Sequence, residues 1–282
     1  MKKKIALLLL LSMVMVNVFA CSKPADEKEE SEEPDTSYES ETERTASEST
    51  QPTEYFEDVA KWSTVTFGNY EGEEIEWLVL DIEGDKMLLM SKYAIECRPY
   101  NTSADPITWE ECSLRAWLNS SFIDSAFSEI ERVRILDTNV VNNDDPVNGT
   151  EGGNDTVDKV FLLSSDEAIN YFDMAQTTGE SYTPSENTED VCCCQPTSHA
   201  QSQGAWVYHY DLNATAMPDP DATVETTAEV DHYRHDGNCN WWLRSPANYP
   251  HGACNINAAG SLGNRWVDDS GVCVRPVMWV SI

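Results

Sequence analysis

Trp241-Trp242-Leu243-Arg244-Ser245-Pro246 stands near the end of the chain, and a second apolar block, Gly271-Val272-Cys273-Val274-Arg275-Pro276-Val277-Met278-Trp279, follows it. We expect residues 241–243 and 274–279 to form neighbouring buried strands, because both blocks combine aromatic and aliphatic side chains. Their tryptophans, with Trp117, are expected in the core. Arg244 and Arg275 are expected to be structural, because a guanidinium offers five donors to carboxylates or backbone carbonyls between strands.

The polar segment between the blocks, residues 248–269, must then leave the core, turn and return. Its Tyr, Asn and Ser side chains combine rigid amphipathic area with adaptable hydrogen bonding, which is the chemistry of binding loops. We predict one exposed ligand-binding face anchored by Trp266, since exposed tryptophans among polar groups are frequent hot spots. Its predicted residues are Tyr249, His251, Asn255, Asn257, Asn264, Arg265, Trp266, Asp268 and Asp269. A polar hairpin that meets only water is the alternative.

Short strand-like and helix-like segments precede these blocks. Strands are predicted at residues 65–67, 75–80, 87–91, 135–141 and 160–163, with turns at Gly68-Asn69 and Gly84-Asp85. Helices are predicted after two capping boxes, Thr108 with Glu111 and Ser164 with Glu167. The mixture predicts an α+β domain. Long polar insertions at residues 142–158, 176–195 and 211–237 are expected to be loops.

The N-terminus has the pattern of an export signal. Lys2, Lys3 and Lys4 precede an apolar run at residues 5–19, which is shorter than the ~20 residues of a spanning helix. Val18-Phe19-Ala20-Cys21 then resembles a bacterial lipobox, which implies that residues 1–20 are a signal peptide and that Cys21 carries lipid. We therefore expect an exported protein that is lipid-anchored to the bacterial cell membrane and faces outward. An ordinary secretory peptide with a chance cysteine is the alternative.

Residues 21–58 are predicted to be a disordered linker, because acidic residues dominate and too few apolar ones are present to offset the entropy of ordering. The whole chain has 18 Lys and Arg against 50 Asp and Glu, a formal charge of -32. This charge argues against a nucleic-acid partner and against direct binding to anionic lipids, so only the lipid anchor should touch the membrane. The 40% hydrophobic share requires a sizeable core, which we place in a domain at residues 59–282.

Four blocks carry a resemblance to a known family. They are the two C-terminal blocks, Thr108-Trp109-Glu110-Glu111-Cys112-Ser113-Leu114-Arg115-Ala116-Trp117-Leu118-Asn119 and Cys194-Gln195-Pro196-Thr197. Together they resemble a bacterial domain family of unknown function that is related to the formylglycine-generating-enzyme type of C-type-lectin fold. The resemblance covers roughly residues 62–282 and implies a C-type-lectin-like domain with long loop insertions. It also implies a variable surface on the C-terminal strands and loops, which is diversified genetically in some similar domains.

Three chemical alternatives accompany this resemblance. Formylglycine-generating enzymes bind copper through a reactive cysteine pair, and Cys254 and Cys273 are the C-terminal candidates for such a pair. The sequence around them matches that pattern poorly. The histidines show no Ser/His/Asp ordering that would indicate a nucleophile. Cys192-Cys193-Cys194 with His199 lacks the usual zinc-ligand spacing. Trp266-Val267-Asp268-Asp269 is similar to the Trp-Asn-Asp strand of calcium-dependent lectins, but the companion sugar motif is missing. We therefore predict no catalytic residue, metal or cofactor.

Eight cysteines remain if Cys21 is lipidated, and an even number in an exported protein favours disulfides. Cys97 with Cys112, and Cys254 with Cys273, are possible pairs between sequence neighbours, and the connectivity stays open. Taken together, we predict a surface lipoprotein that binds an unknown protein or glycan through its C-terminal loops. The alternatives are an enzyme of the formylglycine-generating type and a structural envelope component without a specific ligand.

Overall fold

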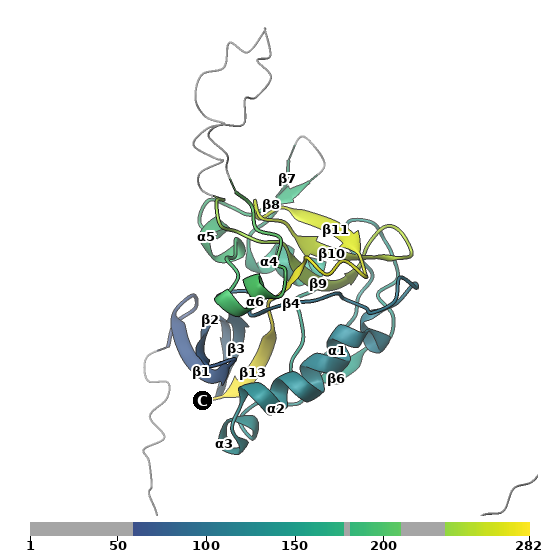
Figure 1. Cartoon of the computed structure of the whole chain (residues 1–282). Helices are drawn as coiled ribbons and strands as arrows, with labels where there is room; N and C mark the ends of the chain where they lie inside the picture. Colours follow the sequence, from purple (N-terminus) through teal and green to yellow (C-terminus); the bar gives the residue numbers. More distant parts are fainter. Residues whose placement is uncertain (1–58, 178–180, 210–234) are drawn as a thin grey trace, which may run out of the picture. The chain divides into compact units, whose positions relative to one another are not determined.

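The computed structural model describes residues 59–177, 181–209 and 235–282. The predicted signal peptide at residues 1–20, Cys21 and the linker at residues 21–58 lie outside this part, as does most of the insertion at residues 211–237. The described part mixes short helices with two main sheets (Figure 1), so the predicted α+β class is confirmed. None of its helices is long and apolar enough to cross a bilayer.

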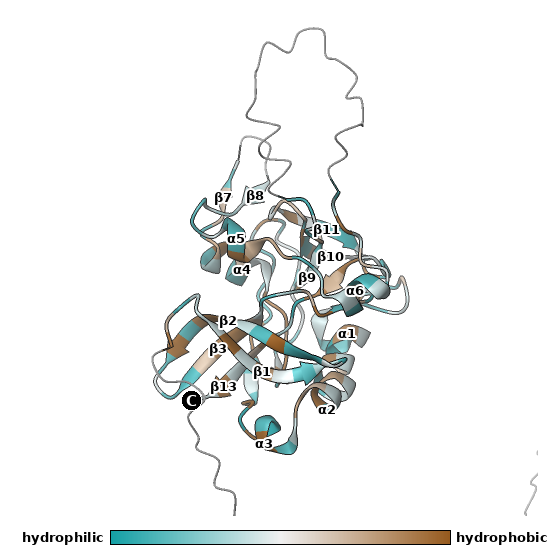
Figure 2. Cartoon of the chain, turned by 60° about the vertical axis from the view of Figure 1, so that its left-hand side comes forward, coloured by the Kyte–Doolittle hydropathy of each residue, from teal (hydrophilic) through white to brown (hydrophobic). Residues whose placement is uncertain are grey.

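The first sheet has four strands in the order β1-β2-β3-β13, and all neighbours are antiparallel. These strands are β1 (Thr64–Tyr70), β2 (Glu73–Glu83), β3 (Lys86–Ser91) and β13 (Val277–Ser281). The strands predicted at residues 65–67, 75–80 and 87–91 are thereby confirmed. Apolar and polar residues alternate along the edge strand β1 (Figure 2), as expected when only one face of a strand packs on the core.

Gly68 lies inside β1, although the sequence predicts a turn there. It adopts a φ of +78°, and a Cβ at this position would lie 2.6 Å from the Phe127 ring. Only glycine therefore lets the helix α2 (Ile123–Ala126) and the residue that follows it approach the strand so closely. The turn that ends β1 falls instead at Glu71 and Gly72, which both have positive φ.

The second sheet has five strands in the order β11-β10-β9-β12-β4. These strands are β11 (Leu262–Trp266), β10 (Gly252–Ile256), β9 (Trp241–Pro246), β12 (Cys273–Val274) and β4 (Glu96–Cys97). The two C-terminal blocks form strands, but the second block divides between the sheets. Cys273 pairs with Trp241 in parallel, whereas β13 pairs with β3 in the first sheet. Pro276 has no N–H to donate to a ladder, which explains why the block divides there.

Short helices pack on these sheets, with α2 against β1, α4 against β9 and α6 against β4. Besides α2, the helices are α1 (Ser113–Trp117), α3 (Glu129–Arg132), α4 (Ser165–Tyr171), α5 (Glu189–Cys192), α6 (Ser198–Ser202), the 3-10 turn η1 (Trp109–Glu111) and the π-turn η2 (Leu118–Phe122). Ser164 and Glu167 form the predicted capping box of α4. The box predicted at Thr108 is wrong, because its side chain makes no cap and the Cys112 thiol caps α1 instead.

Two small hairpins complete the described part. They are β5 (Thr138–Val140) with β6 (Thr156–Asp158), and β7 (Ala175–Gln176) with β8 (Tyr182–Thr183). The strand predicted at residues 135–141 is therefore confined to β5. The segment predicted as a strand at residues 160–163 joins neither sheet as a strand, and only Phe161 forms a bridge, to Val277.

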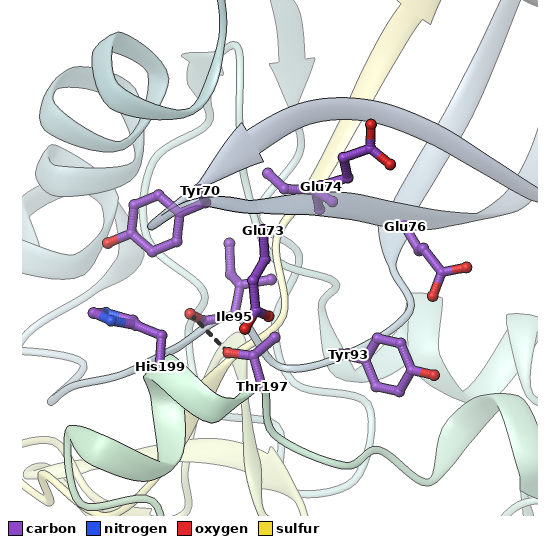
Figure 3. Close-up of a pocket in the computed structure, with 9 residues that line it drawn as sticks. Tyr70, Glu73, Glu74, Glu76, Tyr93, Ile95, Thr197 and His199 are labelled. Atoms are coloured by element: carbon purple, nitrogen blue, oxygen red, sulfur yellow. Dashed lines mark hydrogen bonds between the residues drawn. The ribbon is translucent and has the colours of Figure 1, made fainter.

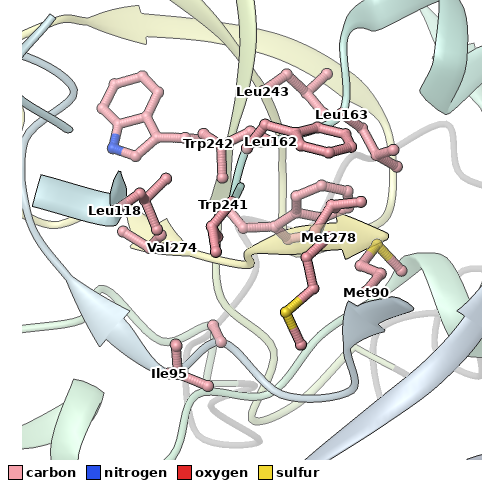
Figure 4. Packing of buried hydrophobic residues seen from close by; sticks show 14 of the residues in the cluster. Met90, Ile95, Leu118, Leu162, Leu163, Trp241, Trp242, Leu243, Val274 and Met278 are labelled. Atoms are coloured by element: carbon pink, nitrogen blue, oxygen red, sulfur yellow. The ribbon is translucent and has the colours of Figure 1, made fainter. Parts of the chain in front are cut away.

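The core is one cluster of buried residues from both sheets and from residues 160–163. Trp241 and Trp242 are 1% and 0% exposed (Figure 4). Buried residues that pack in the same cluster include Leu118, Leu162, Leu163, Val274 and Met278. Trp117 and Trp279, which the sequence places in the core, are only partly buried at its margin.

The two buried arginines have the structural role that the sequence predicts. Arg244 is 2% exposed and donates to side-chain and backbone oxygens of four residues. These are Glu167, Asn142, Val141 and Leu162. Arg275 is 1% exposed and donates to three carbonyls, those of Ser91, Lys92 and Cys192. Each arginine thereby joins segments that are far apart in the sequence.

Candidate functional site

The predicted ligand-binding residues lie on or beside the hairpin β10–β11, at the edge of the second sheet (Figure 1). Side chains along a strand alternate between its faces, and partners in register share a face. Trp266 is opposite Gly252, and Arg265 is opposite Ala253, so Trp266 and Arg265 point to opposite faces. The prediction of one common exposed face is therefore wrong.

One face of the hairpin carries three aromatic rings, those of Tyr249, His251 and Trp266, which we call the aromatic patch. The Trp266 side chain is exposed, with 57% of the residue's surface open to solvent. Its ring centroid lies 5.2 Å from that of Tyr249 and 6.1 Å from that of His251. These separations are typical of favourable aromatic pairs. The patch is therefore an aromatic surface in which Tyr249 and His251 pack against the exposed Trp266 ring.

Local contacts hold the patch in place. The His251 Nδ1 lies 2.5 Å from the Ala104 carbonyl oxygen, which can only accept, so Nδ1 carries a hydrogen and donates it there. The Tyr249 ring lies directly over Gly252, where any Cβ would overlap it. Partial burial raises the pKa of the Tyr249 phenol, with the Arg265 charge opposing this effect. Tyr249 is therefore a neutral hydrogen-bond donor at ordinary pH.

A pocket of about 260 Å³ adjoins the aromatic patch at Tyr249. Ile107 and Pro250 form apolar parts of its wall, and Glu111 and Glu151 also line it. Ionised carboxylates only accept hydrogen bonds. The patch and this pocket thus place flat apolar area beside hydrogen-bond acceptors.

The opposite face of the hairpin opens on a pocket of about 660 Å³. Arg265 and Asp269 line it together with Trp206, which is 51% exposed. Asp269 also accepts the N–H of Gly271 at 2.9 Å, so its carboxylate shapes the turn after β11. These residues form a second polar site that is separate from the aromatic patch.

The remaining predicted residues do not join the patch. Asn255 is 1% exposed, which contradicts its predicted place on the surface, because β10 lies inside the sheet between β9 and β11. Asn257 accepts two backbone N–H groups and so shapes the hairpin turn. Asn264 is exposed on the same face as Trp266 but lines a different pocket, and Asp268 is exposed beyond the end of β11. The structure thus brings only three of the nine predicted residues into the aromatic patch.

Sequence reasoning missed a pocket of about 150 Å³ between the β1–β2 hairpin and α6 (Figure 3). Tyr70 and His199 face each other there, with ring centroids 5.5 Å apart. Both contact the buried Glu96 carboxylate, Tyr70 through its hydroxyl at 2.8 Å and His199 through Nε2 at 3.2 Å. Burial, helped by the Glu96 contact, raises the pKa of Tyr70, so the phenol remains a donor. The only sequence signal was the acidic run that contains Glu73, since the other residues come from distant segments.

The cysteines do not form the pairs that were considered from the sequence. Cys254 and Cys273 lie on β10 and β12, with β9 between them. Cys112 caps α1, and the Cys97 thiol contacts backbone carbonyls near β12. All eight cysteines of the described part are free thiols. Burial raises the pKa of Cys112 and Cys254 to about 12, which keeps both thiols neutral.

Side chains that bind metals do not cluster within residues 59–177, 181–209 and 235–282. No group of three or more His, Cys, Asp or Glu side chains there could hold a metal ion. His199, considered with Cys192-Cys193-Cys194 as a zinc site, contacts Glu96 instead. Asp268 and Asp269, considered for calcium, follow the edge strand and do not converge with further carboxylates on one site.

Comparison with known proteins places the chain in a family. A family model described as a domain of unknown function, DUF6273, matches residues 84–282. The chain belongs to this family. The DUF6273 range contains both C-terminal blocks, the aromatic patch and all eight described cysteines, whereas β1 and β2 precede it. The predicted membership in a domain family of unknown function is confirmed. No curated protein and no solved structure matches the chain.

Proposed function

We propose that this DUF6273 protein is a non-catalytic surface lipoprotein whose domain binds a glycan through the aromatic patch. The observation that carries the proposal is the indole of Trp266, which is 57% exposed and braced by Tyr249 and His251. Leaving a large ring in water costs free energy that ligand binding recovers. Because the rings of Tyr249 and His251 restrict the rotamers of Trp266 before a ligand binds, binding would cost less side-chain entropy.

The chemistry around the patch favours a sugar over a protein segment. The C–H faces of a pyranose are apolar and pack on the electron-rich face of an indole. Sugar hydroxyls can donate to Glu111 and Glu151 in the adjoining pocket. The chain's charge of -32 disfavours an acidic ligand. We therefore infer a neutral or amino-substituted glycan.

The lipid anchor and the C-type-lectin-like fold belong to the same proposal. The anchor is supported by the lipobox at residues 18–21 and by the three lysines near the N-terminus. Lipid at Cys21 would hold the domain on the outer side of the membrane. The fold relation is supported by the second C-terminal block, whose last strand, β13, returns to pair with β3 of the first sheet.

The same structure bears on the two alternative functions. An enzyme of the formylglycine-generating type would need Cys254 and Cys273 to converge, but β9 separates their strands. The exposed indole of Trp266 would have no function in a structural envelope component without a ligand. The geometry therefore favours ligand binding over both rivals.

The proposal is tested by measuring the binding of the chain from residue 22 onward to glycan and protein arrays. Trp266→Ala should weaken binding to the captured glycan by about 30-fold, because truncating a hot spot costs about 2 kcal/mol. Val133→Ala is the matched control, since Val133 is 79% exposed beside α3, and this variant should bind like wild type. Both variants should keep the wild-type melting temperature. Equal binding by the two variants, or capture of protein ligands only, would contradict the proposal.

A further inference from the structure

A chain of four buried thiols runs through the second sheet and takes no part in the aromatic patch. Cys97 lies on β4, Cys273 on β12, Cys239 just before β9, and Cys194 just after α5. All four residues are at most 6% exposed. The Cys273 thiol neighbours those of Cys97 and Cys239, and the Cys239 thiol neighbours that of Cys194.

Cys97 and Cys273 have a backbone register that suits a disulfide. They are direct partners in the antiparallel pair of β4 and β12. Neither residue donates its backbone N–H to the other's carbonyl, because the Cys97 N–H donates to the Glu96 carboxylate and the Cys273 N–H donates to the Asn240 carbonyl. Partners of this non-hydrogen-bonded kind have Cα atoms about 4.5 Å apart, within the range of about 4.4–6.8 Å that disulfides span.

Cys194 and Cys239 are also adjacent through their main chains. The Cys239 N–H donates to the Cys194 carbonyl at 2.8 Å, and the two side chains meet as described above. An additional bridge pairs Cys239 with Val207, so this segment is held on both sides. The main chains of these two residues are therefore already in contact.

We propose that the four thiols form a disulfide site, in which Cys97 pairs with Cys273 and Cys194 pairs with Cys239. A bond between Cys239 and Cys273 is the competing arrangement, because Cys273 contacts two neighbours. That arrangement would leave Cys97 and Cys194 unpaired at opposite ends of the chain of thiols. The proposed pairing leaves none of the four unpaired. It would tie β4 to β12, and the segment after α5 to the start of β9.

Each bond forms by exchange with a small external disulfide, R–S–S–R. The Cys97 thiolate attacks one sulfur of the reagent, which forms a mixed disulfide and releases R–S⁻. The Cys273 thiolate then attacks the Cys97 sulfur and expels the second R–S⁻. The protein loses two hydrogens as two protons and two electrons, and the reagent leaves as two R–SH molecules. Cys194 and Cys239 react in the same way.

The two bonds should form at different rates. The pKa of Cys194 is raised by burial, and those of Cys239 and Cys273 are raised by a neighbouring thiol and by burial, all well above the usual value for a thiol. Because the thiolate is the nucleophile, these three thiols attack an external disulfide slowly, so only the bond that Cys97 can start should form early. Cys97 is the most exposed of the four residues, at 6%, and should react first.

The experiment uses the full chain, reduced and folded, with oxidised glutathione as the external disulfide. Remaining thiols are alkylated in denaturant, and disulfide-linked peptides are mapped by mass spectrometry. We expect linked peptides for Cys97 with Cys273 and for Cys194 with Cys239, each with a mass about 2 Da below that of its two thiols. Cys112 and Cys254 should be alkylated.

Three results would overturn the proposal: alkylation of all four thiols after oxidation, a Cys239–Cys273 link, or a link from Cys97 to Cys112. The wild-type map needs no substitution, so it remains decisive if a variant fails to fold. As a matched pair of variants, Cys273→Ser should abolish the first link and keep the second, whereas Cys112→Ser should keep both. A loss of both links with Cys112→Ser would also contradict the proposal. None of these outcomes depends on glycan binding.

Discussion

Arg244→Met should lower the free energy of unfolding by about 3 kcal/mol, at the lower end of the 3–5 kcal/mol that breaking a buried ion pair costs. Methionine is also long and apolar but donates no hydrogen bond. The Leu162 carbonyl, in a residue that is 0% exposed, and the Asn142 amide oxygen would then lose a donor away from water. Each buried unsatisfied acceptor costs about 1–3 kcal/mol. The Glu167 side chain is 34% exposed and regains some hydration, which is why we expect the lower end.

Arg132→Met is the matched control for this prediction. The Arg132–Asp124 pair has the same nitrogen–oxygen distance as Arg244–Glu167, 2.5 Å, but Asp124 is 71% exposed. Exposed ion pairs contribute about 0–1 kcal/mol, so the control should lose at most about 1 kcal/mol. Urea titrations followed by tryptophan fluorescence measure both free energies of unfolding. Equal losses in the two variants would show that burial of Arg244 does not govern its contribution.

Three further predictions follow from particular contacts. Gly252→Ala should displace the Tyr249 ring and weaken glycan binding, and it should also lower the melting temperature, because the new Cβ would lie 2.8 Å from the Ala247 Cβ; array binding at the wild-type level would contradict this. The free energy of unfolding should fall as pH rises above 9. Folding raises the pKa of Cys112 and Cys254 from 9.0 to about 12, so these thiols ionise in the unfolded chain at a lower pH than in the folded protein. Urea midpoints that stay constant up to pH ~10 would refute this prediction. Cys21→Ser should release the protein from the membrane fraction or leave it uncleaved, and mature protein that still begins at residue 21 and stays membrane-bound would refute the anchor.

The sequence by itself determined the features that depend on neighbouring residues. The strands β1 to β3, the capping box of Ser164 and Glu167, and the structural roles of Arg244 and Arg275 were all predictable. Strand and cap signals succeed because alternation and N-terminal capping involve residues only a few positions apart. The arginines were predictable because a cation in an apolar block must find acceptors when it is buried.

Only the tertiary structure decided how distant segments meet. It divided the last apolar block between two sheets, placed Trp266 and Arg265 on opposite faces, and buried Asn255. It also placed Cys97 directly opposite Cys273 on neighbouring strands, which no spacing in the sequence indicates. These outcomes depend on strand order and register, and a shift of one residue in register reverses the face of every side chain in a strand. Composition and local periodicity contain no signal for that choice, so the aromatic patch and the chain of thiols became visible only in the folded protein.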